Sequence, residues 1–102
     1  MPSNNFKIFD ENKQNILSDE EYNTNTQRTN GVQAGIASSK LNNKFSYQVS
    51  LMAYALSQLM IENGIDALDS AEVNTFVDNL GSALLQKVVD KANKVLAEAG
   101  ED

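Results

Sequence analysis

The sequence contains no cysteine and no histidine. Without cysteine, the chain has no disulfide, no thiolate metal site and no thiol nucleophile. Without histidine, it lacks the commonest metal ligand and the commonest general base of enzymes. These absences remove most hydrolase and metalloenzyme mechanisms. We therefore predict that the protein is not an enzyme and has no catalytic residue, no cofactor and no metal-binding residue of that kind.

Positive charge is also scarce. Eight lysine and arginine residues face 14 acidic ones, the net charge is −6, and Arg28 is the single arginine. A nucleic-acid-binding protein needs a positive stripe to neutralise phosphates, so we expect no nucleic-acid partner. The most apolar window, Phe45–Ile61, is interrupted by serine and glutamine and is too short to cross a bilayer, so we expect no membrane span.

What the sequence does contain predicts a mainly α-helical fold. A length of 102 residues allows one domain at most. We expect an irregular N-terminal arm over residues 1–37, with a short helix at about 19–26, followed by a helical hairpin over residues 38–102. The two long helices, at about 38–63 and 70–98, are expected to be antiparallel and to pack in an oligomeric helical bundle, because a lone pair leaves apolar surface uncovered.

Helix boundary signals support these ranges. Ser18 followed by Glu21 forms a capping box for the short helix. The pair Ser38-Ser39 predicts the start of the first long helix, and Gly64 suits the left-handed residue that ends it. Asp69, with Glu72 three residues later, predicts the cap of the second long helix.

Apolar residues recur along both long helices. The first is apolar nearly all round at Leu51–Leu56, and a helix of that kind needs neighbours on several sides. The second is expected to present a single apolar face, formed by Val73, Val77, Leu80, Leu84, Val88, Ala92, Val95 and Ala99. From the two patterns we predict subunit contacts at Leu51, Met52, Tyr54, Leu56, Leu84, Val88 and Val95.

The N-terminal arm contains candidate docking residues, each of which also has a purely structural interpretation. Phe6, Ile8 and Phe9 either pack on the chain's own helices or dock on a neighbouring subunit. Arg28 either bonds nearby acids and turn carbonyls or holds a partner through its planar, bidentate guanidinium group.

Acidic residues suggest two further sites, both with simple structural explanations. Asp10, Asn12, Gln14 and Glu21 fall at positions 1, 3, 5 and 12 of a calcium-loop pattern. Gln14 is a poor ligand there and no helix precedes the loop, so calcium binding at 10–21 stays open beside a solvated loop. Asp66, Asp69 and Glu72 are explained by a turn and a helix start.

Several short motifs resemble the N-terminal region of phage and prophage tail proteins from Gram-positive-type bacteria. They comprise an aromatic start, an acidic element ending in tyrosine, and a series of polar and glycine-containing motifs before an apolar helix. In this chain they are Phe6–Phe9, Asp19–Tyr22, Thr26–Arg28, Asn30–Val32, Gly35–Ser38 and Asn43-Lys44. The resemblance covers about residues 4–90.

The resemblance implies a structural role. In that family the region attaches a tail fibre or host-recognition protein to the tail or baseplate, and it is often trimeric. It implies a homo-oligomer, with a trimer favoured, that has tail or baseplate partners and is located in a virion or phage-tail-like particle assembled in the bacterial cytoplasm. The alternative is a small stand-alone acidic helical-hairpin interaction protein, a homodimer for which secretion stays open. Proteins of that kind carry a Trp-x-Gly turn, and this chain has no tryptophan.

Overall fold

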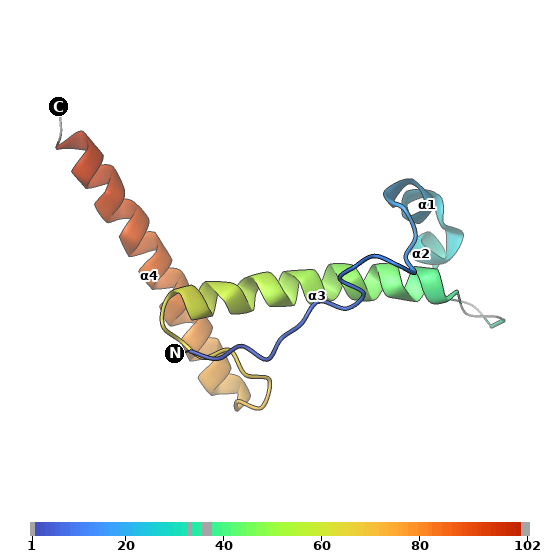
Figure 1. The fold of residues 1–102 in the computed structure, drawn as a ribbon, viewed down its shortest axis with the longest axis horizontal. Coiled ribbons are helices and arrows are strands. Elements are labelled where there is room, and N and C mark those ends of the chain that lie inside the picture. Colours follow the sequence, from blue (N-terminus) through green and yellow to red (C-terminus); the bar gives the residue numbers. More distant parts are fainter. Residues whose placement is uncertain (1, 33, 36–37, 101–102) are drawn as a thin grey trace. The chain divides into compact units, whose positions relative to one another are not determined.

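The computed structural model describes residues 2–32, 34–35 and 38–100, and these form a mainly helical protein (Figure 1). The helices are α1 (Asp19–Thr24), α2 (Thr26–Asn30), α3 (Ser39–Glu62) and α4 (Val73–Ala99). The described residues contain no strand, only an isolated parallel bridge between Asn4 and Ala67. The prediction of a mainly helical fold with two long helices is confirmed. Antiparallel packing of these helices in an oligomeric bundle stays a prediction.

Two compact units divide the chain. One contains Met1–Phe6 and Tyr54–Asp102, and the other contains Lys7–Ala53. The first unit is therefore built from segments far apart in sequence. Helix α3 supplies residues to both units.

The Lys7–Ala53 unit contains two short helices where the sequence predicted one. The capping box at Ser18 is confirmed, because its side chain accepts from the Glu21 amide while Glu21 accepts from the Ser18 amide. Asn25 then leaves the helical conformation, and its side chain accepts from the amides of Gln27 and Arg28. Asparagine is among the strongest N-cap residues, so it ends α1 and begins α2 within one residue.

Helix α3 begins and ends where the sequence predicted. The Ser38 hydroxyl accepts from the Leu41 amide, as an N-cap does. At the other end, the Ile65 amide bonds Met60 O and the Gly64 amide bonds Ile61 O. These are the two bonds of a Schellman motif, which requires a left-handed residue, and Gly64 has φ of 77°.

The start of α4 differs from the prediction. Its N-cap is Glu72, whose carboxylate accepts from the Thr75 amide, and the helix begins at Val73. Asp69 does not cap it. The Asp69 carboxylate accepts from the Asn5 side-chain amide, and the Asp69 backbone amide donates back to Asn5. Asn5, which lies 64 residues earlier in the chain, therefore bonds Asp69, the residue that local spacing predicted as the N-cap.

The core of the unit containing α4 is small. Met60, Ala67 and Ala83 are fully buried. Phe6, Phe76 and Leu80 are among the half-buried residues that pack around them, and the Phe6 and Phe76 rings meet edge to face with centroids 5.8 Å apart. Among the described residues, the helical ones that form this core come from the end of α3 and the first three turns of α4.

Candidate interaction surfaces

The Arg28 side chain bonds within its own unit. Its Nε donates to Tyr22 O at 2.7 Å and its second terminal nitrogen donates to Asn23 O at 2.9 Å. The guanidinium group also lies 5.6 Å from the centre of the Tyr22 ring. Arg28 thus bonds carbonyls at the end of α1, in keeping with the interpretation in which it bonds nearby turn carbonyls. A docking role would use the donors that remain.

The acids of α1 are also bound locally. Asp19 forms an ion pair with the buried Lys44 of α3, whose ammonium lies 5.8 Å from the centre of the Tyr22 ring. The bond from Lys44 lowers the pKa of Asp19, and the Ser18 backbone amide lowers the pKa of Glu21. Sequence reasoning missed Lys44, because nothing in a lone lysine indicates that its stem will be buried.

The calcium-loop pattern folds as a tight turn. The two carboxylate oxygens of Asp10 accept from the backbone amides of Gln14 and Asn15. Glu21, at the twelfth position, completes the capping box. The described residues contain no group of three or more acidic side chains arranged to hold a metal ion. Asp10 and Glu21 of this loop thus bond backbone amides.

A groove of about 410 Å³ lies between α2 and the start of α3. Val32, Leu41 and Phe45 give it an apolar lining, and Gln27 and Arg28 give it a polar edge. The side-chain oxygen of Gln27 is buried without a hydrogen-bond partner. Sequence reasoning did not identify this groove, because its lining comes from three helices, α1, α2 and α3, and from the residues that follow α2. Residues 36 and 37 of the nearby Gly35–Ser38 motif lie outside the described residues.

The aromatic start of the chain divides between two environments. Phe6 packs against Phe76 in the small core, as its structural reading expects. Phe9 is 55% exposed, and its backbone amide donates to the Ser50 hydroxyl at 2.8 Å. Ile8, between them, is half-buried. Of the three predicted docking residues, Phe9 offers the most accessible surface.

Helix α3 carries an exposed apolar stripe. Phe45, Val49, Met52 and Leu56 follow one another at steps of four, three and four residues, which places them on one face. We call these four residues the α3 stripe. All are exposed, Met52 at 63%. Of the other predicted contact residues on this helix, Leu51 is exposed and Tyr54 is half-buried.

Helix α4 has two apolar faces, not the single face that the sequence predicted. Phe76, Leu80 and Ala83 contact the small core, and Ala83 is the only buried residue among the described residues of this helix. A second face is exposed, and we call its residues the α4 stripe. The α4 stripe consists of Leu85, Val88, Val89, Ala92, Val95, Leu96 and Ala99. At 100° per residue the two faces point about 150° apart.

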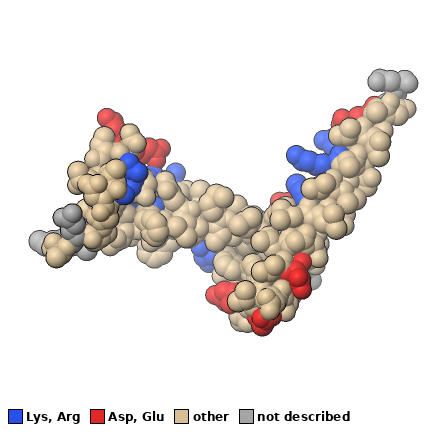
Figure 2. All heavy atoms as spheres, turned by 180° about the vertical axis from the view of Figure 1, so that it is seen from behind, with Lys and Arg blue, Asp and Glu red and all other residues tan. Residues whose placement is uncertain are grey.

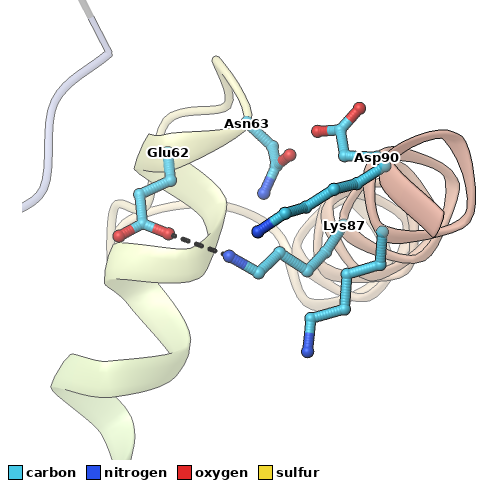
Figure 3. A pocket seen from close by; sticks show the side chains of 6 residues that line it. Glu62, Asn63, Lys87 and Asp90 are labelled. Carbon is cyan, nitrogen blue, oxygen red and sulfur yellow. Dashed lines mark ion pairs between the residues drawn. The ribbon is translucent and has the colours of Figure 1, made fainter. Parts of the chain in front are cut away.

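The face of α4 that contacts the core becomes charged beyond Ala83. Its next positions are Lys87, Asp90 and Lys94, which line a notch of about 290 Å³ together with Lys91, Glu62 and Asn63 (Figure 3). Lys87 reaches Glu62 at 3.8 Å, and both side chains are at least half exposed. Figure 2 shows lysines gathered along one side of α4. Leu84, a predicted contact residue, lies at the border of the exposed face and is 46% exposed.

Comparison with protein-family models, curated proteins and solved structures gives no match. The family resemblance therefore rests on the short motifs alone. None of the helices in the described part of the chain combines the length and apolar character needed to span a membrane. The features that stand out are the two exposed apolar stripes on the long helices.

Proposed function

We propose that the protein is a non-enzymatic structural protein that assembles with copies of itself through its two long helices. The exposed α3 and α4 stripes carry this proposal. Each extends over several helical turns, whereas single exposed apolar residues are ordinary on protein surfaces. Large contiguous apolar faces on a small helical unit are typical of surfaces that become buried in an assembly.

We place this assembly in a phage or phage-tail-like particle, where it attaches a tail fibre or host-recognition protein to the tail or baseplate. The resemblance of the motifs between Phe6 and Lys44 supports this role. The attachment surface would lie in the N-terminal region. There, Phe9 and Ile8 offer apolar contact surface and Arg28 retains further hydrogen-bond donors.

The resemblance favours a trimer, and the α3 stripe suits a contact of that kind. Its residues repeat with the four-and-three spacing of a coiled-coil seam. The flanking positions include Gln48, Ala53 and Ala55, which are uncharged. Three such faces can meet around an axis without bringing like charges together.

Sedimentation equilibrium of the purified chain tests self-assembly. The expected mass is three times the chain mass of 11.2 kDa, or a multiple of that trimer. Met52→Glu places a charge in the α3 stripe and is expected to abolish the trimer. Gln14→Glu, in the exposed turn, adds the same charge and is expected to leave the mass unchanged.

The oligomeric state of the wild-type chain decides between the proposals. A wild-type chain that stays monomeric at 100 µM, about a hundredfold above a micromolar Kd, would overturn self-assembly. A wild-type dimer would replace the fibre-attachment trimer with the stand-alone interaction protein. The particle assignment is tested separately by mass spectrometry of purified tail particles from the source bacterium. Detection of the chain in cell lysate but not in particles would reject it.

A further inference from the structure

The α4 stripe needs a partner other than the chain's own core. The face of α4 that packs on that core runs through Phe76, Leu80 and Ala83 and then becomes charged. The stripe lies about 150° away around the helix. Contact with the helix's own unit through the core face therefore leaves the stripe uncovered. Its leucines and valines are between 41% and 70% exposed.

We propose that the α4 stripe is a two-fold contact site that binds the same stripe of a second copy in antiparallel orientation. This inference rests on the proposed self-assembly and specifies its partner, direction and register. From Leu85 onward the stripe follows a seven-residue repeat. Leu85, Ala92 and Ala99 occupy one seam position, and Val88 and Val95 occupy the other.

Charge complementarity sets the direction and the register. Lys91 and Glu98 occupy equivalent positions of successive repeats, on the same border of the stripe. In an antiparallel pair this border meets the same border of the second copy. When Ala92 lies opposite Val95, Lys91 lies beside Glu98 of the second copy, and the two-fold axis repeats the ion pair. Shifting the register by one repeat toward the N-terminus places Lys91 beside Lys91, which is repulsive.

Side-chain sizes fit the same register. Ala92 faces Val95 and Ala99 faces Val88, so each layer combines a small residue with a larger one, and the layers have nearly constant volume. On the other border of the stripe, Val89 faces Leu96 of the second copy. In a parallel, in-register pair Lys91 would lie beside Leu96, and Ala92 would meet Ala92 and leave a thin layer.

This contact is separate from the proposed trimer contact on α3. A two-fold contact joins chains in pairs, so it links two trimers or, when the α3 stripe is blocked, yields a dimer. The Met52→Glu variant should therefore be a dimer. It isolates the α4 contact from the trimer contact.

Charge exchange in the Met52→Glu background tests the pairing. Lys91→Glu alone and Glu98→Lys alone should each raise the dimer dissociation constant about tenfold, because two like-charge contacts replace two ion pairs. The double exchange should restore it to within about threefold. Lys94→Glu, on the opposite face, is the matched control and should leave it within about threefold. A double exchange that is no better than the single variants would overturn the register.

Cysteine cross-linking tests the direction without interference, because the chain has no cysteine of its own. Chains carrying Val88→Cys and chains carrying Ala99→Cys should form a mixed disulfide when oxidised together. Neither should cross-link efficiently to itself, since the step of 11 positions from 88 to 99 separates identical cysteines by about 16 Å in the antiparallel pair. Self-linked Ala99→Cys dimers would overturn the antiparallel arrangement in favour of a parallel one.

The two proposals fail in different ways. A monomeric wild-type chain would remove both. A wild-type trimer that falls to monomers with Met52→Glu would support the proposed function and reject the α4 contact. A dimer with mixed cross-links but no trimer would support the α4 contact and reject the fibre-attachment trimer.

Discussion

The α1–α2 segment and the last four turns of α4 present opposite chemistry to solvent. Between Ser18 and Asn30 most of the described polar contacts lie inside the same unit: two N-caps, an arginine on two carbonyls and a buried lysine on Asp19. Beyond Ala83, α4 exposes most of its apolar side chains. The difference separates a segment whose polar groups are mostly bonded within the unit from a helix whose apolar face is left exposed, and we propose that a second chain covers that face.

The largest effect that we expect is on the free energy of unfolding, when a residue of the small core is replaced. Met60→Ala should lower the free energy of unfolding by about 2–5 kcal/mol, because Met60 is fully buried and its removal leaves a cavity. Met52→Ala, in the same helix but on the α3 stripe, should change it by less than about 0.5 kcal/mol when urea unfolding is followed in monomeric protein. Equal losses in both variants would erase the distinction between core and stripe.

A smaller effect is expected at Arg28. Arg28→Ala removes two hydrogen bonds to carbonyls at the end of α1, and we expect a loss of about 1 kcal/mol because the site is exposed. Arg28→Lys should recover only part of it, since an ammonium lacks the planar fork. Thermal unfolding measures both. Unchanged stability combined with lost binding to tail or baseplate proteins would assign Arg28 to docking instead.

The smallest effect that we expect is the loss of stability when the pH is lowered. Asp19 and Glu21 have lowered pKa values in the folded chain, so their contribution is present above their unfolded pKa values and is lost as pH falls through the folded ones. The stability difference between wild type and Asp19→Asn should therefore shrink below about pH 4. In a Lys44→Met background this pH dependence should largely vanish, because Lys44 is the main cause for Asp19. Urea unfolding at a series of pH values measures it, and a difference that stays constant with pH would contradict the ion pair.

Sequence reasoning succeeded where structure is local. The Ser18 capping box, the Ser38 cap and the left-handed Gly64 each involve residues within a few positions of one another, so spacing and propensity were sufficient. It failed where a distant segment intervened. Asp69 has the spacing of an N-cap, but Asn5 binds it, and no local pattern encodes a partner 64 residues away.

The candidate surfaces show the same limit. Periodicity correctly indicated that α4 is an apolar helix, but it merged two faces into one, because a spacing of about 3.7 residues drifts around a helix with 3.6 residues per turn. Only the position of the core separates Leu80, which contacts it, from Val77 and Val88, which do not. The predicted contact residues and docking residues remain predictions until an assembly is measured.

The bonds between Asn5 and Asp69 also constrain the order in which the chain can fold. They close a loop of more than 60 residues, and the backbone of Ser3 and Asn5 pairs with Ala67 in the same place. Closing a loop of that length carries an entropic cost before any contact offsets it. During synthesis the first residues must remain unpaired until the turn after α3 has emerged, whereas the Ser18–Asn30 segment can form its caps as soon as it is made. The segment from Ser3 to Asn5, although made before α1 and α2, thus reaches its final place after them.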